Sequence, residues 1–197
     1  IGVRLVGSEM CIRDRYNALA ASTGKNGTSA NVAVGYSAGS AITSGSSNTI
    51  VGYLAGDAID TMTDNTAIGA GALGGSSLVD KTVVIGSGAG AAAMTADADG
   101  TIAIGYQAGL AITSGEKNTA IGFEALAVEA TGDLSTAVGY QALKACTGVS
   151  GEIGNTAFGY QAGLAVTTGQ ANIAIGIGSL RTTTTGGMNI CIGRDTM

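Results

Sequence analysis

One stretch of the sequence has the spacing of a dinucleotide-binding loop. The glycines of Gly69–Gly74 satisfy the pattern Gly-x-Gly-x-x-Gly, which brings a cofactor pyrophosphate against the start of a helix. Such a loop must be followed by a helix with a polar face and, about 20 residues on, by an acidic residue that binds the ribose. No such helix pattern follows, and residues 89–94 contain no acidic residue. The sequence therefore predicts no nucleotide cofactor at this loop.

Other reactive side chains lack the partners that chemistry would need. Asp97 and Asp99 suggest calcium ligands, but the Gly- and Asp-rich nonapeptide of calcium-binding solenoids is absent, so a turn is the better interpretation. The chain has no His, so neither His-based acid–base chemistry nor a Ser-His triad can be built from its own residues. Cys11, Cys146 and Cys191 show no metal-ligand spacing and no even-numbered disulfide framework. We predict a protein that is not an enzyme and has no catalytic residues, no metal site and no cofactor.

A repeat accounts for the regularly placed glycines. The pattern Asn-Thr-Ala-Ile-Gly at Asn118–Gly122 recurs from one end of the chain to the other, mostly at steps of 17 residues. A period in this range is typical of a solenoid in which each repeat forms one coil. Gly69 is itself a repeat glycine, which removes the remaining support for a nucleotide loop. The repeat glycines lie at positions 35, 52, 69, 86, 105, 122, 139, 159, 176 and 193.

The composition fits such a solenoid and limits its partners. Gly makes up 34 of 197 residues, Pro is absent, and only 4% of residues are aromatic and 12% charged, which suits thin, stacked β structure built from small and β-branched side chains. The net charge is −5 and the sequence contains no basic stripe, so we expect no nucleic-acid partner. No run of 18 apolar residues occurs, so a transmembrane helix is not expected.

The core of each repeat has the alternation of a β-strand. Thr119 and Ile121 stand for two large positions of the repeat, with the small Ala120 between them, a period of two that indicates a strand. We expect the large residues to face a thin core and the Ala row to lie against a close neighbour. Asn118 represents an Asn position that is expected to form a hydrogen-bonded ladder between coils.

The rest of the repeat predicts a second short strand and a turn. Leu110–Ile112 represents the second strand, and Thr-Ser-Gly or Thr-Thr-Gly follows it. Phe123–Ala130 resembles a helix when taken alone, but the register of the repeat overrules this local preference. The segments 91–100 and 144–154, where the period lengthens, are expected to be protruding loops. The chain is thus predicted to be all-β, a parallel β-solenoid or β-roll of about ten coils.

Aromatic side chains occupy one position of the repeat, directly after the Gly. Because stacked coils lie about 4.8 Å apart, neighbouring rings should form a ladder. Two interpretations remain open, a half-buried packing ladder and an exposed surface that binds sugars. The candidate ladder residues are Tyr36, Tyr53, Tyr106, Phe123, Tyr140 and Tyr160, with Tyr16 in an incomplete first copy.

The first fifteen residues do not fit the repeat. Leu5–Arg15 closely resembles the translation of an adapter used in preparing sequencing libraries, so residues 1–15 are expected to be foreign and outside the fold. Tyr16–Leu19 then matches Tyr140–Leu143, which predicts that the adapter interrupts an eleventh copy. We expect residues 16–197 to be a single repeat domain, truncated at both ends.

The repeats at Asn118–Gly122 and Thr101–Ala108 resemble the heads of trimeric autotransporter adhesins. They are also similar to repeats of phage tail-fibre proteins that end in a self-cleaving chaperone domain, and the resemblance covers residues 16–197. It implies a left-handed β-roll and a homotrimer. It further implies an extracellular location, on a virion tail fibre or a bacterial cell surface, and contact with a host-cell glycan or protein.

Two functions follow from these expectations. The first is the structural and adhesive region of a fibre, and the alternative is a surface-binding solenoid such as an ice-binding protein. An exposed, unbroken Thr row would favour ice, whereas buried β-branched rows beside a self-associating Ala face would favour the fibre. Val and Ile interrupt the Thr row, which predicts that this position lies inside. The Thr residues of this row are Thr49, Thr66, Thr119, Thr136 and Thr156.

Overall fold

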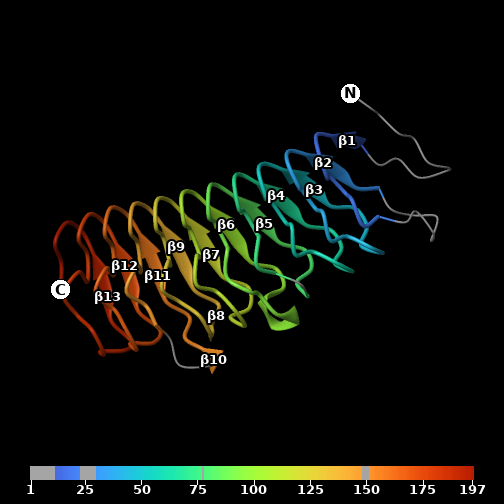
Figure 1. The fold of residues 1–197 in the computed structure, drawn as a ribbon. Coiled ribbons are helices and arrows are strands. Elements are labelled where there is room, and N and C mark those ends of the chain that lie inside the picture. The colour runs from blue at the N-terminus through green and yellow to red at the C-terminus, as the bar shows by residue number, and fades with distance from the viewer. Residues whose placement is uncertain (1–11, 23–29, 77, 148–150) are drawn as a thin grey trace.

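The computed structural model describes residues 12–22, 30–76, 78–147 and 151–197 and shows a parallel β-solenoid (Figure 1). Each coil of about 17 residues contributes one short strand to an eleven-stranded sheet, and neighbouring strands are consecutive in the chain apart from a minor pair described below. The predicted fold class and coil length are therefore confirmed, whereas the left-handed winding stays a prediction. The strands are β1 Ile12–Asp14, β2 Val32–Val34, β3 Thr49–Val51, β4 Thr66–Ile68, β5 Val83–Ile85, β6 Ile102–Ile104, β7 Thr119–Ile121, β9 Thr136–Val138, β11 Thr156–Phe158, β12 Ile173–Ile175 and β13 Ile190–Ile192.

The strands pair in the register of the repeat, so equivalent residues form straight rows along the solenoid. Thr119 lies beside Ile102 on one side and Thr136 on the other. The backbone of β1 pairs with β2 in the same way, and the domain boundary at residue 16 stays a prediction. The foreign origin of residues 1–15 stays a prediction.

The longer repeats place their additional residues away from the main sheet. Residues 91–100 contain a short 3-10 helix, η1 (Ala96–Ala98). Residues 144–154 contain β10 (Gly151–Glu152), which pairs in parallel with β8 (Gly132–Asp133), and residues 148–150 lie outside the described part. Figure 1 shows η1, β8 and β10 along the same border of the solenoid, opposite the coil bends that follow the main strands.

The two faces of each strand are the reverse of the prediction. Ala120 is fully buried, whereas Ile121 is 36% exposed and Thr119 is half-buried. The middle residue is the buried one in every main strand from β2 to β13. The coil is thin, and its interior is already occupied by Leu, Ile or Met side chains from the opposite wall, so the strand has room for only a small residue inside. The large residues of the strand consequently face outward.

Leu110–Ile112, the segment predicted to be a second strand, instead belongs to a run of turns, and the equivalent described residues of the other coils form no strand either. Gln107 and Gly109 both have left-handed φ, 51° and 56°, which an extended strand does not contain. The backbone still pairs between coils, because the Gln107 N–H donates to Ser87 O (3.1 Å) and the Gly109 N–H donates to Ala125 O (2.9 Å). Phe123–Ala130 follows the same course without a helix, as the repeat register predicted.

A size exchange keeps the core filled in several coils. Where the fourth residue after the repeat Gly is Gly, a large side chain further on fills the space: a Cβ at Gly109 would lie 2.9 Å from Ile112 Cδ1. Where that residue is Leu73, its later partner Ser76 is small, and both are fully buried. The coil of Leu126 is an exception, because the residue three further on is Glu129, which is also fully buried. Other coils repeat one arrangement or the other: Gly39 with Ile42, Gly56 with Ile59, Gly90 with Met94, Gly163 with Val166, and Leu143 with Cys146.

The buried Asn row forms the predicted ladder. Asn48 Nδ2 donates to Met62 O within its own coil (2.7 Å), and Asn48 Oδ1 accepts the Asn65 N–H of the next coil (3.0 Å). Each such amide therefore closes its coil and joins it to a neighbour, which satisfies buried backbone groups. The row is interrupted where Thr101 and Ser135 replace Asn, and their hydroxyl oxygens are buried without a partner.

Candidate functional site

The most extensive candidate surface is the outward side of the main sheet. We define the outer face as the first and third residues of β2–β7, β9 and β11–β13. Its first row contains Thr, Val and Ile, its second row contains Val, Ile and one Phe, and neither row contains a charged residue. Exposed members of the second row include Ile121 at 36%, Ile175 at 39% and Phe158 at 45%. Together the rows expose on the order of 1,000 Å² of mainly apolar surface, above the few hundred Å² usual for a soluble monomer.

The candidate aromatic residues form two stacked runs beside this face. Tyr16, Tyr36 and Tyr53 stack at ring-centroid distances of 5.5 and 5.6 Å. The second run contains Tyr106, Phe123, Tyr140 and Tyr160, with centroids 5.0, 5.3 and 5.1 Å apart. Inside each run the ring faces cover one another, so these rings offer mainly their edges to solvent. The rings therefore form a stacked ladder and are also exposed, whereas sugar binding stays a prediction.

A second ladder, made of polar side chains, lies at the repeat position directly after the aromatic one. Gln161 Nε2 donates to Gln141 Oε1 (3.0 Å), and Gln141 Nε2 donates to Glu124 Oε2 (2.8 Å). Lys144 Nζ also donates to Glu124 Oε2, at 2.6 Å. Hydrogen bonds from Lys144 and Gln141 lower the pKa of Glu124 below its ordinary value. Sequence reasoning missed this ladder, although the recurrence of Gln and Glu directly after the aromatic position could have indicated it.

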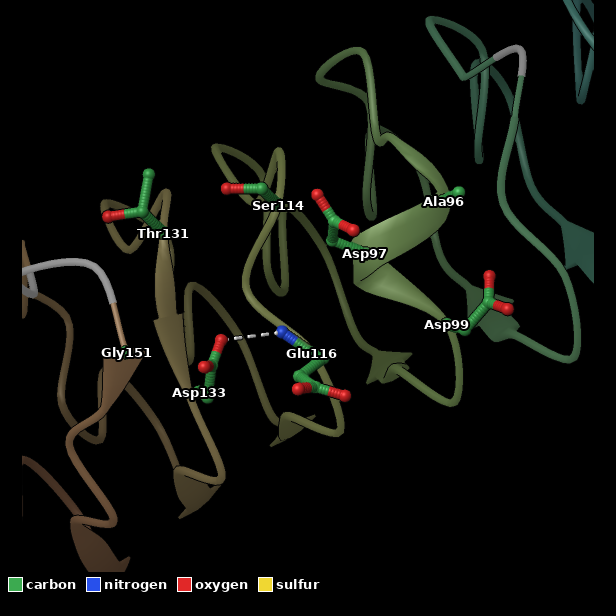
Figure 2. Close-up of a pocket in the computed structure, with 8 residues that line it drawn as sticks. All are labelled: Ala96, Asp97, Asp99, Ser114, Glu116, Thr131, Asp133 and Gly151. Carbon is green, nitrogen blue, oxygen red and sulfur yellow. Dashed lines mark hydrogen bonds between the residues drawn. The ribbon is translucent and has the colours of Figure 1, made fainter.

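A cavity of about 430 Å³ lies beside η1 and is rich in carboxylates (Figure 2). Asp99 Oδ1 accepts the Asp80 N–H (2.7 Å), and Asp133 Oδ1 accepts the Glu116 N–H (2.9 Å). Figure 2 shows the carboxylates spread over successive turns rather than converging on one point. Among the described residues, no group of three or more His, Cys, Asp or Glu side chains is arranged to hold a metal ion. The cavity lining is Ala96, Asp97, Asp99, Ser114, Glu116, Thr131, Asp133 and Gly151.

The residues that the sequence analysis rejected as reactive groups lie in different parts of the solenoid. Cys146 and Cys191 are buried core residues, whereas Cys11 lies outside the described residues. Asp97 belongs to η1. Gly69–Gly74 forms the bend of one coil, and the described residues after it contain no α-helix.

Comparison with known proteins adds no relative to these observations. The chain matches no protein-family model, and neither a curated protein nor a solved structure is significantly similar to it. Within the described part of the chain, no helix has the length and apolar character needed to cross a membrane. Functional inference therefore depends on the surfaces themselves.

Proposed function

We propose that this chain is the structural and adhesive repeat region of an extracellular or virion fibre whose copies associate through the outer face. The supporting observation is the pair of exposed apolar rows, which run along the main sheet without a charged residue. A stable interface buries about 800 Å² per partner, and the outer face is large enough to supply this area. Its burial would remove Val, Ile and Phe side chains from water, which favours association.

Three copies are proposed because the repeats resemble those of trimeric adhesin heads and phage tail fibres. In-register rows support this proposal, since equivalent residues would meet at each level along a shared axis. A fibre of this kind would present many identical coils to a host-cell glycan or protein. Weak contacts at each coil would then combine into strong attachment.

One observation favours the alternative of an ice-binding surface. Thr119, Thr136 and Thr156 lie in consecutive strands on the outer face, so the prediction that this position lies inside is wrong. The row continues with Val and Ile, and the adjacent row has no hydroxyl group at all. Thermal hysteresis of a dilute solution would support the ice-binding alternative, and its absence at high protein concentration would count against it.

Lysine substitutions on the outer face test the fibre proposal. The variant Ile104→Lys/Ile121→Lys places charges in the second row and should prevent association, because an unpaired charge is costly to bury. Val128→Lys is the matched control, since Val128 is 44% exposed but lies outside the outer face. Negative-stain electron microscopy should show multi-stranded rods for the native chain and the control, and single thin solenoids for the outer-face variant. Single solenoids for the native chain would overturn the proposal.

A further inference from the structure

The aromatic ladder has a gap two coils long. Ala70 and Ser87 occupy the ladder position between Tyr53 and Tyr106, and both are exposed. The coils remain continuous through the gap, because Gln107 N–H donates to Ser87 O (3.1 Å) as elsewhere along the row. The gap therefore comes from side-chain size and not from a break in the solenoid.

The adjacent column of side chains is missing over the same two coils. Gly71 and Gly88 stand where other coils carry the Gln or Glu of the polar ladder. A Cβ placed on Gly71 would have no heavy atom within 4 Å. The gap is thus open over two neighbouring columns and two successive coils.

The rings at the two ends of the gap each have a face that no neighbouring ring covers. Tyr53 stacks only on Tyr36, and Tyr106 stacks only on Phe123. Tyr53 is 58% exposed and Tyr106 46%, compared with 45% for Tyr36, which has a ring on both sides, so the free face adds to the exposure of Tyr53 only. Three coil steps of about 4.8 Å separate the two walls. Since rings in the runs stack at 5.0 to 5.6 Å, the gap has room for a ring against either wall.

An unpaired amide lies at the same place. Gln141 and Gln161 each donate to a side chain in the preceding coil, but the coil before Gln107 offers only Gly88. Gln107 Cγ lies 3.4 Å from the position that a Gly88 Cβ would take, so this side chain covers part of the gap. The structure records no side-chain hydrogen bond for Gln107 with any described residue. Its amide retains two N–H donors and an acceptor oxygen for a ligand.

We propose that the gap between Tyr53 and Tyr106 binds a pyranose unit of a cell-surface glycan, with Gln107 bonding to the sugar hydroxyls. A pyranose has an apolar C–H face that packs on an aromatic ring, and hydroxyl groups at its edge that can exchange hydrogen bonds with an amide. A purely aromatic ligand would stack but would leave the amide unused. This combination of apolar contact with a few polar groups is typical of small-molecule sites.

This inference rests on the proposed adhesive function and names the class of ligand. The rungs inside the two runs are poor sugar sites, because their ring faces are covered by neighbouring rings. The amides of Gln141 and Gln161 are already bonded to side chains of the polar ladder. A single exposed site of this kind should bind weakly, with a Kd of about 1 mM. Several copies in one fibre would raise the strength of attachment through multivalency.

Glycoside titration of the full chain tests the site. Methyl pyranosides of glucose, galactose, mannose and N-acetylglucosamine are added to about 50 mM, well above the expected Kd, and NMR follows the Gln107 side-chain amide and the rings of Tyr53 and Tyr106. At least one glycoside should shift these signals saturably. The absence of any shift across the panel would overturn the proposal.

Two variants separate binding from folding. Ala70→Tyr/Ser87→Tyr completes the ladder, so it should retain the fold and lose binding about tenfold or more. Gln107→Leu should weaken binding about tenfold, whereas Gln141→Leu, whose amide is already bonded, should leave it unchanged. Unchanged binding in the filled variant would contradict the site. The mass of the particle in solution is followed in parallel. A chain that binds sugar but remains a monomer would overturn the fibre proposal and leave the sugar site standing. A chain that associates but binds no sugar would overturn only the sugar site.

Discussion

Replacing one repeat glycine by alanine should be far more damaging than the size of a methyl group suggests. Gly122 has φ of 137°, and a Cβ there would lie 2.3 Å from the carbonyl oxygen of Gly139 in the next coil. Ordinary C···O contacts are about 3.3 Å or longer, so the next coil would have to move by about 1 Å. That coil is held by the Gly139 N–H, which donates to Ile121 O at 2.8 Å. The substitution therefore combines backbone strain with overpacking between coils.

We expect Gly122→Ala to lower the free energy of unfolding by about 4 kcal/mol, with strain and overpacking each contributing about 1–3 kcal/mol. Gly71→Ala is the first control, because φ is 64° and the added Cβ meets no atom within 4 Å; it should cost about 1 kcal/mol. Gly193→Ala is the second control, because its φ of 129° is close to that of Gly122 but the atom nearest to the added Cβ is Thr196 Cγ2, at 3.1 Å. It therefore separates the backbone strain from the overpacking between coils.

Urea unfolding followed by circular dichroism measures the differences between these variants. Gly122→Ala should also lower the melting temperature by about 10 °C, since 1 kcal/mol corresponds to about 2–4 °C in a chain of this size. If Gly122→Ala lay within about 0.5 kcal/mol of Gly71→Ala, the close approach of successive coils would be wrong.

Three further predictions concern the core, the Asn ladder and pH. Leu73→Gly and Ser76→Ile should each lower the free energy of unfolding by about 1–4 kcal/mol. In urea titrations the double variant should recover at least half of the summed loss, because it recreates the Gly and Ile pairing of other coils. Additive losses would contradict the size exchange. Asn48→Ala should cost about 2–3 kcal/mol in thermal melts, since it leaves buried backbone groups unpaired, and a loss below about 0.5 kcal/mol would count against the ladder. The hydrogen bond from Lys144 lowers the pKa of Glu124 from its ordinary 4.5. The stabilisation from the Glu124 carboxylate should therefore be present above pH 4.5 and disappear as the pH falls through the lower folded-state pKa. Glu124→Gln should lose this part of the pH dependence of stability, and an unchanged loss of stability at acid pH would refute the assignment to Glu124.

The repeat period predicted the coil but could not predict which strand face lies inside. Thr119-Ala120-Ile121 alternates in size, and alternation establishes two faces without stating how wide the interior is. The interior is narrow because the opposite wall brings Leu, Ile and Met inward, so Ala120 is buried and Ile121 exposed. The absence of charge from both large rows was the available signal that these exposed residues form one surface.

The turn segments show a second limit of sequence reasoning. Leu110–Ile112 has the β-branched and apolar character of a strand, yet the preceding Gln107 and Gly109 adopt left-handed φ. Gln is seldom found in that conformation, so its type did not reveal the bend. Stacking supplies the reason, because each bend forms hydrogen bonds with the bends of neighbouring coils. The gap at Ala70 and Ser87 was visible as a break in the Tyr positions, but the open amide of Gln107 required the structure.

The mass of the native chain in solution tests the central claim most directly, namely that the outward apolar rows join copies of the chain. One chain has a mass of 19.0 kDa. Light scattering over a dilution series should give a stable multiple of this value, with three chains expected, and Ile104→Lys/Ile121→Lys should return the mass to that of one chain without altering the β signal in circular dichroism. A native chain that stays at 19.0 kDa throughout the series would contradict the claim.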